Sequence, residues 1–565
     1  MRKKFFLIFT SFLTFGLNIS FAQYASPSTY SKGWHFEDRM TSGVYGISLN
    51  KAYNELLKNM QPQKKIIVAV IDSGVDTLHE DLSSVLWKNR KEIPYNGIDD
   101  DKNGFIDDVY GWNFIGGKDG RNVSKDSYEG ARVYFKYREV FGEKEINEDT
   151  LRNELKPFYK TYKKAQAQLE SQAKDAALYV LILKDIVARI PSADSTIQQA
   201  IGKNEYTGDE LQSFKSTDPL INKAKSVVLS IFQQTKEMDK TNTLLIGELT
   251  RFYEGEKSKL EAIEKAPRPY RAEIVQDIYS DINDRFYGNA DVMGPESSHG
   301  THVSGIIGAD RKNGIGINGI ADHVEIMTIR AVPDGDEHDK DIANAIRYAV
   351  DNGAWVINMS FGKSFSPEKN WVDEAALYAE SKGVLLVHAA GNDAKNIDIE
   401  DNFPSKNLNN DTNKVFTNWI NVGASGASEE EIIASFSNYG KREVNVFAPG
   451  VRIYSTIPGG NVYGEKDGTS MASPVVSGLA ALILSYYPTL SVKQLKWVIE
   501  QSVTKVDKTN INKEENENEM ASLQDLSSTG GIINAYNAIK LASTLKGERI
   551  LEANKSNLNK KGNRK

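Results

Sequence analysis

The chain has 565 residues and contains no cysteine. Disulfide bonds are therefore excluded, and so is a lipid anchor attached to a cysteine at the end of a leader peptide. A protein exported without disulfides must be stabilised by the size of its core, and a bound metal could add to that stability. The length exceeds that of a typical domain, so we expect more than one folded part.

A strong charge of one sign is also lacking, because the formal net charge is −7 with 26% charged residues. Without a basic field over the protein, a nucleic-acid partner is not predicted. After the N-terminal leader, no apolar run approaches the ~20 residues of a membrane-spanning helix. We therefore predict no integral membrane segment once the leader is removed.

The first 22 residues have the pattern of a signal peptide. Residues 2–4 are basic, residues 5–17 are mostly apolar and too short to span a bilayer comfortably, and residues 20–22 (Ser-Phe-Ala) fit a cleavage site. We predict cleavage after Ala22 and export to the periplasm or the extracellular space. A retained N-terminal anchor is the alternative.

The most informative pattern is the string DGTSMASP at residues 467–474. Gly468 allows a tight turn with close backbone approach. The apolar residues of 475–484 predict a buried helix that begins close to Ser470, with Pro474 in its first turn. Free N–H groups and the helix dipole favour an oxyanion there, so Ser470 is predicted to be a nucleophile.

A serine nucleophile needs a base and a group that orients the base. His299 stands among small residues in the string SSHGTHVSG. Asp72 ends the β-branched run 66–71, which is typical of a buried parallel strand, and open α/β sheets place their sites at the carboxyl ends of such strands. Another buried strand, residues 384–388, leads to the carboxamide of Asn392.

Each of these four residues has an ordinary structural explanation when it is taken alone. Asp72 and Ser470 could cap helices, Asn392 could stand in a turn, and His299 could fill a core position. Their joint occurrence in this context favours a catalytic site. Five other histidines have no partner pattern and are predicted to be structural or surface residues: His79, His302, His323, His338 and His388.

The four motifs occur in the order of the subtilisin-like serine proteases (subtilases), which the chain therefore resembles. The strings VINMSFG and FAPG also match that family, and the resemblance covers about residues 45–115 and 286–542. It implies a doubly wound parallel α/β sheet and hydrolysis of protein or peptide substrates. It also implies these roles: Ser470 attacks, His299 is the base, Asp72 orients His299, and Asn392 donates to the oxyanion.

By the same resemblance, the backbone of Ser360 and Gly362 and the segment around Gly335 would flank a bound peptide. Asp393 would lie at the rim of the pocket for the residue before the scissile bond. Four acidic residues accompany Gly335: Asp334, Asp336, Glu337 and Asp339. They could favour Lys or Arg in the substrate, or they could form a solvated loop with little effect.

Residues 99–108 (DDDKNGFIDD) resemble the first part of an EF-hand calcium loop, with oxygen-bearing side chains at alternate positions before a glycine. The closing bidentate glutamate is missing, since Tyr110 stands there, and Asp107 or Asp108 could replace it. The spacing favours structural calcium over a solvated acidic turn. The predicted ligands are Asp99, Asp101, Asn103 and Asp108.

The family resemblance suggests a second calcium site. Asp81 follows Asp72 at the spacing where subtilases place a calcium-ligating Asp, and the glycine-rich loop 313–319 resembles the loop that supplies the rest of that site. Asn313 could contribute its side-chain oxygen. The length of the loop after His299 departs slightly from the family pattern.

The separation of Asp72 from His299 is 227 positions (299 − 72), far more than a minimal subtilase has there. Residues 127–285 within it are rich in Lys, Glu, Gln and Ala, and apolar residues recur at helical spacing. This pattern predicts an inserted helical subdomain rather than a disordered charged linker. The segment before Asp72 is too short for the inhibitory prodomain that many relatives carry.

The predicted organisation has five parts. A signal peptide (1–22) is followed by a catalytic domain in two pieces (23–126 and 286–545), which the helical insert (127–285) interrupts, and by a disordered basic tail (546–565). Strands and helices alternate between His299 and Ser470, as in a doubly wound parallel sheet. The predicted strands are 324–330, 355–360, 384–388, 419–422 and 444–447; residues 507–528 are predicted to be a loop, and residues 532–545 a closing helix.

Two other classes of function stay open at this point. One is an inactive subtilase fold used only for binding, which the presence of every catalytic position disfavours. The other is recruitment of a partner by the helical insert, with proteolysis secondary. The sequence leaves the oligomeric state and the natural substrate open.

Overall fold

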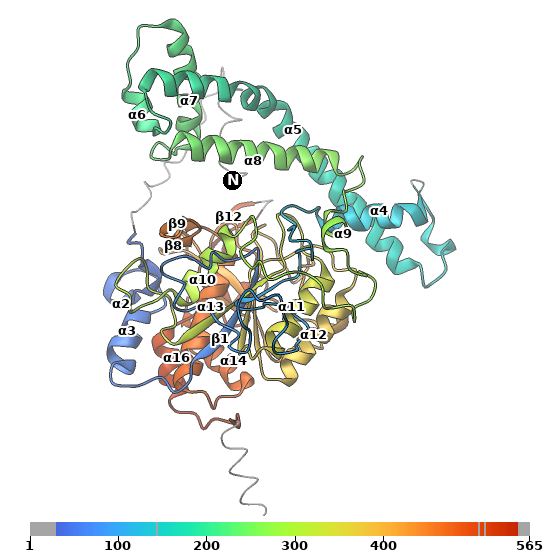
Figure 1. Ribbon diagram of the computed structural model, residues 1–565, viewed down its shortest axis with the longest axis vertical. Helices are drawn as coiled ribbons and strands as arrows, with labels where there is room; N and C mark the ends of the chain where they lie inside the picture. Colours follow the sequence, from blue (N-terminus) through green and yellow to red (C-terminus); the bar gives the residue numbers. More distant parts are fainter. Residues whose placement is uncertain (1–29, 143–144, 507–508, 514–515, 552–565) are drawn as a thin grey trace, which may run out of the picture. The chain divides into compact units, whose positions relative to one another are not determined.

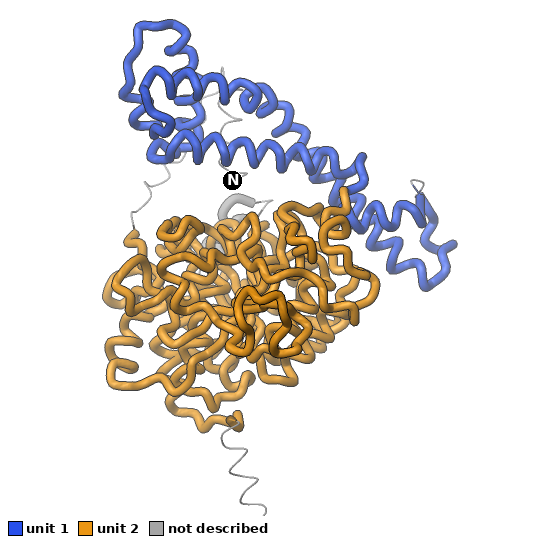
Figure 2. The backbone as a smooth tube through the Cα atoms, in the orientation of Figure 1, with its two compact units in different colours: residues 1–28, 130–267 blue, residues 29–129, 268–565 orange. Residues whose placement is uncertain are grey.

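The computed structural model describes residues 30–142, 145–506, 509–513 and 516–551. The chain forms two compact units (Figure 2). Gly130–Pro267 forms the helical unit, and Thr29–Glu129 together with Arg268–Lys565 forms the sheet unit. The predicted signal peptide lies outside the described residues, as does the tail from residue 552 onward.

A nine-stranded sheet forms the centre of the sheet unit. Its strands are β1 (Ile66–Asp72), β2 (Gly111–Asn113), β3 (Val324–Arg330), β4 (Val356–Met359), β5 (Leu385–Ala389), β6 (Trp419–Ser425), β7 (Val446–Pro449), β10 (Thr504–Lys505) and β13 (Gly531–Ile532). They lie in the order β10-β13-β7-β6-β5-β4-β1-β3-β2, and all neighbours are parallel except β10 and β13. The doubly wound parallel sheet predicted from the sequence is confirmed.

Strand β1 shows why the sheet forms in the middle of the core. Its β-branched and small residues alternate between the two faces: Val68 and Val70 join the core on one face, while Ala69 and Ile71 join the core on the other. A strand with both faces buried has no solvent side, which explains its continuous apolar run.

Helices cover both faces of the sheet (Figure 1). Helices α10 (Ser298–Gly308) and α13 (Thr469–Tyr486) pack on one face, and α11 (Asp339–Asp351) and α12 (Lys369–Ser381) pack on the other. Among the described residues, α13 alone is long and apolar enough to cross a membrane, and 94% of it is buried inside the protein. It is the central helix of the core.

Strand β1 lies between β3 and β4, which follow it in the chain and pair with its two sides. The winding direction of the sheet therefore reverses at β1. In open α/β sheets, ligands bind outside the carboxyl ends of the strands at such a switch point. Asp72, the last residue of β1, stands at this position.

The remaining elements of the sheet unit are short. They are the α-helices α2 (Arg39–Ser42), α3 (Leu49–Lys51), α9 (Tyr270–Val275), α14 (Val492–Gln501), α15 (Leu523–Leu526) and α16 (Ala535–Ala542). The antiparallel pairs are β8 (Ile453–Ile457) with β9 (Val462–Lys466) and β11 (Thr509–Lys513) with β12 (Asn516–Ala521). The 3-10 helices are η1 (Trp34–Phe36) and η4 (Leu408–Asn410), and η2 (Ala52–Leu57) is a π-helix.

The helical unit has its own apolar core. It is formed by α4 (Glu129–Phe141), η3 (Glu148–Thr150), α5 (Lys156–Ile201), α6 (Gly208–Ser213), α7 (Pro219–Thr235) and α8 (Asn242–Glu261). Ile190 of α5, Phe232 of α7 and Leu249 of α8 are buried against one another in this core. Their helical spacing in the sequence produces one apolar stripe per helix.

The helical unit (130–267) is shorter at both ends than the predicted insert (127–285). The residues that the prediction added, 127–129 and 268–285, bond to the sheet unit. Before the helical unit, Glu129 donates from its backbone N–H to Asp336 at 2.7 Å and forms an ion pair with Lys363 at 2.9 Å. After it, Arg271 of α9 forms ion pairs with Asp277 and Asp341, each at 2.6 Å and nearly fully buried. The flanks therefore belong to the sheet unit.

Two further expectations differ from the structure. Residues 507–528, predicted to be a loop, contain the antiparallel pair β11–β12 and helix α15. The predicted tail starts too early, because Arg549 donates from its backbone N–H to Thr489 and lies over the ring of Trp355 at 4.1 Å. Long-range contacts of this kind leave no local pattern.

Candidate active site

The carboxylate of Asp72 holds the ring of His299. The Nδ1 atom of His299 lies 2.8 Å from Asp72 Oδ1 and 3.0 Å from Oδ2. Asp72 is 2% exposed, and its Oδ1 also accepts the N–H of Ser73 at 2.7 Å. Gly300 permits this approach, since a Cβ there would stand 2.3 Å from the carbonyl oxygen of Gly74. A carboxylate at Nδ1 leaves Nε2 as the nitrogen that can take a proton.

Ser470 is the second residue of α13. The helix follows Gly468, whose φ of +149° is a conformation that other residues rarely adopt. The hydroxyl thus lies in the first turn, where backbone N–H groups have no partner within the helix. Pro474 lies in the second turn rather than in the first turn predicted from the sequence.

Pro474 cannot donate to the carbonyl of Ser470, four residues earlier. The hydroxyl of Ser360 donates to that carbonyl instead, at 3.0 Å. In return, the Oγ of Ser470 donates to the carbonyl of Ser360 at 3.2 Å. This exchange fixes the start of α13 to the segment after β4. Among the described residues no hydrogen bond joins His299 and Ser470, a contact that often tightens only when substrate binds.

Asn392 presents its amide nitrogen beside Ser470. Its Oδ1 accepts from the backbone N–H of Thr469 at 2.8 Å and from the Thr469 hydroxyl at 2.9 Å. Thr469 is fully buried, so these bonds set the orientation of the carboxamide. Within the described part of the chain nothing accepts from Nδ2, which is therefore available to a developing oxyanion.

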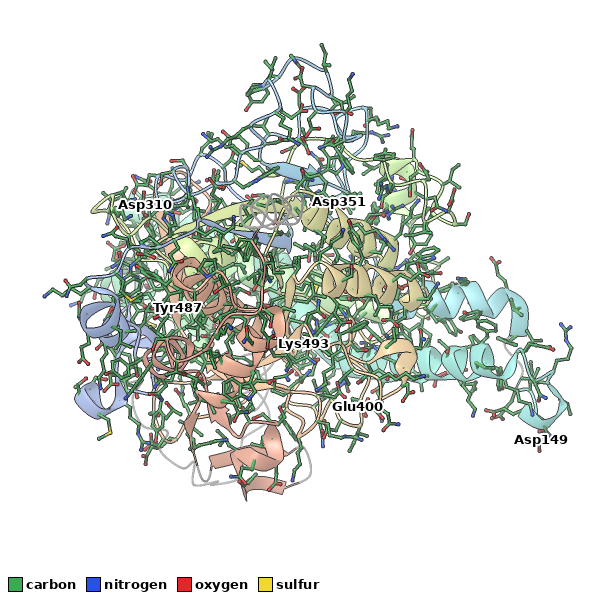
Figure 3. All side chains as sticks on the ribbon, turned by 90° about the horizontal axis from the view of Figure 1, so that it is seen from below. Asp149, Asp310, Asp351, Glu400, Tyr487 and Lys493 are labelled. Atoms are coloured by element: carbon green, nitrogen blue, oxygen red, sulfur yellow. The ribbon has the colours of Figure 1, made fainter. Side chains whose placement is uncertain are left out.

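A cavity of about 270 Å³ adjoins Ser470 and Asn392. Its walls are the segments 361–364 and 389–393, and the loop 395–402, which includes Glu400 (labelled in Figure 3), closes it. Asp393 lines it as predicted by the family resemblance, and it is exposed. The cavity is large enough for one side chain of a bound peptide.

Two backbone segments near the cavity carry free hydrogen-bonding groups. Phe361 and Lys363 use theirs within the protein, whereas Gly362 between them is exposed and its backbone has no partner among the described residues. Likewise the backbone of Asp334 bonds to Ser124 and Asp126, whereas the backbone of Gly335 has no partner in the part of the chain that the structure describes. Extended peptides pair with such segments.

Most of the acidic residues near Gly335 are engaged inside the protein. Asp336 accepts from the N–H of Glu129 at 2.7 Å, and Asp339 pairs with Lys363 at 2.8 Å. Glu337 is buried, and burial raises its pKa to about 8. Asp334 is the member of this group that is exposed to solvent. The group therefore presents far less negative charge than its sequence indicates.

The loop 99–108 brings carboxylates together, with one contributor that the sequence pattern missed. One oxygen each of Glu92, Asp99 and Asp101 lie within 4.8 Å of one another. Glu92 is 6% exposed, and its Oε2 has no hydrogen-bond partner. A buried carboxylate oxygen without a donor is costly unless a cation compensates it. Glu92 comes before the loop, so the EF-hand pattern gave no signal for it.

The other two predicted ligands of this loop, Asn103 and Asp108, use their side-chain oxygens in hydrogen bonds within the protein. The Oδ1 of Asn103 accepts from the N–H of Phe105 at 2.8 Å, and its amide donates to Asp108 at 3.0 Å. Asp108 also accepts from Asn89 at 2.7 Å and from Tyr348 at 2.6 Å, and burial raises its pKa to about 6. Because three donors already bond to Asp108, it supports the loop.

A cavity of about 360 Å³ adjoins the loop and is lined by Asp101 and Asn103 among others.

Asp81 has a different environment. Its carboxylate accepts from the side-chain amide of Asn313 at 2.7 Å and from the backbone N–H of Ile317 at 2.8 Å. Asn313 thus turns a donor toward Asp81 where a calcium site needs an oxygen. In this arrangement donors already occupy the carboxylate of Asp81, whereas the cluster around Glu92 has a buried carboxylate oxygen without a donor.

The other histidines serve the framework. Burial lowers the pKa of His302 to about 3 and that of His388 to about 4. His302 bonds through Nε2 to the carbonyl of Gly464 at 3.1 Å, and His79 does so to the carbonyl of Val462 at 2.9 Å. These rings are held away from the reacting groups.

Most of the chain matches a known protein family. The model of the subtilase family matches residues 63–519. A thermophilic serine proteinase of Bacillus sp. (strain AK1) is 41% identical over 215 residues, which are 38% of this chain and 48% of that protein. Subtilisin E of Bacillus subtilis (strain 168) is 39% identical over 212 residues, 37% of this chain and 51% of that protein. The chain thus spans about half the length of these relatives.

Subtilisin BL of Lederbergia lenta is 36% identical over 217 residues, 38% of this chain and 73% of that protein. Two solved structures are also similar. Proteases from Pseudoalteromonas arctica PAMC 21717 align over 90% of this chain and 97% of that one, with a TM-score of 0.44 and 18% identity. A serine-to-alanine mutant of the protease domain of PatA aligns over 44% of this chain and 81% of that one, with a TM-score of 0.35 and 26% identity.

Proposed function

Because the chain belongs to the subtilase family, we propose that it is an exported serine endopeptidase that hydrolyses proteins or peptides. One observation carries the proposal: His299 is held by buried Asp72 at the carboxyl edge of the sheet, and Ser470 and Asn392 converge on the same edge. The order of these residues in the chain matches the family.

The proposed reaction begins at the Oγ of Ser470, which attacks the scissile carbonyl. His299 accepts the hydroxyl proton at Nε2 and later delivers it to the leaving amine, while Asp72 stabilises the imidazolium. The amide of Asn392 and the backbone N–H of Ser470 donate to the oxyanion. Water then hydrolyses the acyl-enzyme with His299 again as base.

Substrate binding is proposed to use the free backbone groups of Gly335 and Gly362, with the substrate between them as an added strand. The carbonyl of Ser360, next to the substrate strand, accepts from the hydroxyl of Ser470. Asp393 lines the cavity and would face the substrate side chain that enters it. The predicted signal peptide (1–22) would direct the enzyme to the periplasm or the extracellular space.

The catalytic proposal is tested with the purified mature chain. Wild type should cleave casein and label with a fluorophosphonate probe, and Ser470→Ala should do neither while it keeps the same circular dichroism. Asn418→Ala, which removes a buried asparagine far from the motif residues in sequence, is the control and should retain activity. Equal activity of wild type and Ser470→Ala would refute the mechanism.

We further propose that calcium stabilises the sheet unit at the cluster formed by Glu92, Asp99 and Asp101. Carboxylate oxygens are the ligands that calcium prefers, and Asn103 and Asp108 would orient the loop around them. When bound, the ion would neutralise these carboxylates and fix the loop. Asp81 and Asn313 remain a weaker second candidate, because Asn313 would first have to rotate its amide.

Chelation should lower the melting temperature by several degrees, since a ligand that binds only the folded state is removed. Glu92→Gln should reduce this difference between chelated and calcium-loaded protein, whereas Asp81→Asn tests the second candidate separately. An unchanged melting curve in chelator, with no calcium found by elemental analysis, would exclude both sites.

A further inference from the structure

One buried side chain makes three hydrogen bonds to the loop that carries Asn392. Asn438, 45 positions beyond Asp393, is 3% exposed and directs all its side-chain hydrogen bonds to this loop. Its Oδ1 accepts the N–H of Asp393 at 3.0 Å and the N–H of Lys395 at 2.9 Å. Its Nδ2 donates to the carbonyl of Ala390 at 2.9 Å.

The backbone of Asn438 adds a fourth bond. Its N–H donates to the carbonyl of Gly391 at 2.9 Å. The bonded residues Ala390, Gly391 and Asp393 flank Asn392 on both sides. Asn438 therefore restrains the backbone on both sides of Asn392.

Asn438 can act as a fixed point because its own position is set by β6. The hydroxyl of the preceding residue, Ser437, accepts the N–H of Ala424 in β6 and donates to the carbonyl of Asn438, both at 2.9 Å. Gly391 also contributes, since a Cβ there would stand 2.4 Å from the Nδ2 of Asn438. The loop and the asparagine thus fit against each other without free space.

Different contacts hold the side-chain carboxamide of Asn392 and the backbone on either side of it. Thr469 binds the Oδ1 of the carboxamide, and the bonds from Asn438 hold the backbone from which the carboxamide extends. The Thr469 hydroxyl also accepts the N–H of Gly391 at 3.1 Å, which restrains the backbone before Asn392. Without the Asn438 side chain, the N–H groups of Asp393 and Lys395 after Asn392 would lose their acceptor, and the carboxamide would be held less precisely. An oxyanion donor must be held within a fraction of an ångström to contribute fully.

We propose that Asn438 is a positioning residue for catalysis, which places Asn392 at the oxyanion and does not itself contact the reacting atoms. The proposal rests on the proposed peptidase function. The step that Asn438 supports is the attack of Ser470 on a peptide carbonyl, so its effect would appear mainly in kcat. Asn438 also lines the cavity beside Ser470, so a small change in KM is compatible with this role.

The expected result for Asn438→Ala is a fall in kcat of about 10- to 100-fold with KM changed by less than about 3-fold, because misplacement by about 1 Å costs up to about 10²-fold. The loss cannot exceed that of Asn392→Ala, about 10²–10³-fold, which is the loss found when the corresponding donor of a subtilisin is removed.

A double-mutant cycle separates positioning from stability. Asn438→Ala should lower kcat by less than about 3-fold in the Asn392→Ala background, because the group that it positions is absent. Asn418→Ala is the matched control: its amide donates to the carbonyl of Val384 at 2.8 Å, so it should lower the melting temperature with kcat unchanged. If Asn438→Ala does not fold, Asn438→Asp, which keeps the acceptor, enters the same cycle.

The possible outcomes are distinct. Wild type without peptidase activity would refute the proposed function itself. An active wild type with an unchanged kcat in the Asn438 variant, or with equal losses in both backgrounds, would overturn only the role of Asn438. A kcat loss that disappears in the Asn392→Ala background would establish it.

Discussion

The sheet unit and the helical unit are stabilised by different kinds of polar contact. In the sheet unit, buried groups far apart in the sequence meet: Asp72 lies 227 positions from His299, and Glu129 lies 234 positions from Lys363. In the helical unit many polar contacts are local, as in the capping box in which Thr207 and Glu210 bond to each other's backbone N–H. Contacts between residues far apart in the sequence can bring reactive groups together, whereas a local cap only stabilises the start of one helix.

The two units also differ in their content of histidine and tryptophan. All seven histidines and all seven tryptophans of the chain lie outside residues 130–267. Histidine titration therefore belongs to the sheet unit. Tryptophan fluorescence consequently reports on the sheet unit alone, and this allows the two units to be compared in one molecule.

The largest contrast should come from matched carboxylate substitutions. Asp72→Asn should lower kcat by about 10⁴-fold, since the imidazole loses the group that sets its tautomer. Asp194→Asn, which alters a carboxylate of the helical unit that accepts from Tyr206 and Asn242, should leave kcat unchanged. Steady-state cleavage of a peptide substrate measures both, and a large loss in Asp194→Asn would break the comparison.

A smaller effect should follow from removal of a buried cation. The side chain of Lys363 is 2% exposed and pairs with Glu129 at 2.9 Å and with Asp339 at 2.8 Å. Lys363→Met should lower the free energy of unfolding by about 3–5 kcal/mol, because both carboxylates stay buried without their cation.

Urea unfolding followed by tryptophan fluorescence measures that loss. The counterpart Lys203→Met in the helical unit breaks an exposed pair with Glu210, and by circular dichroism it should produce no measurable change. Similar losses in the two variants would show that burial does not distinguish the units.

Acid should act on the sheet unit through its buried histidines. The pKa of His302 is about 3 in the folded protein, below its ordinary value of 6.5, because burial disfavours the charged form. The unfolded chain therefore binds the proton first as the pH falls. The stabilisation is complete above pH 6.5 and is lost progressively as the pH falls toward 3.

The size of this effect is about 1.4 kcal/mol per pH unit for one histidine, or about 2 kcal/mol between pH 6.5 and pH 5. His302→Gln removes the titrating group and can keep a donor for Gly464, so its unfolding free energy should depend less steeply on pH than that of wild type. Parallel curves for the two proteins between pH 7 and pH 5 would contradict the assignment.

The smallest effects should be equal in the two units. Ser491 of the sheet unit and Thr207 of the helical unit each form a complete capping box. Ser491→Ala and Thr207→Ala should each cost about 1 kcal/mol of unfolding free energy, because each leaves one N–H at a helix start without its partner. Thermal unfolding followed by circular dichroism at 222 nm measures both, and a strongly unequal cost would show that tertiary packing also depends on one cap.

The sequence by itself was sufficient for the fold class and for the identity of the candidate catalytic residues. The apolar run of β1 has to be buried on both faces, and the glycine at 468 permits a positive φ before a helix that other residues rarely adopt. Such properties are local, so they appear in a few adjacent residues. The helical insert was predictable for the same reason, because its apolar stripes repeat within each helix.

Only the tertiary structure decided how these residues are supported. Glu92 joins the carboxylates of the loop 99–108 from outside its pattern, and Asn438 holds the loop of Asn392 from the segment between β6 and β7. The exchange of bonds between Ser360 and Ser470 compensates for Pro474, which the sequence alone would place in an unstrained first turn. The contacts of Asn438 and of Ser360 with Ser470 join segments that are far apart in the sequence, so no local spacing reveals them; Glu92 lies near its loop but outside the known pattern.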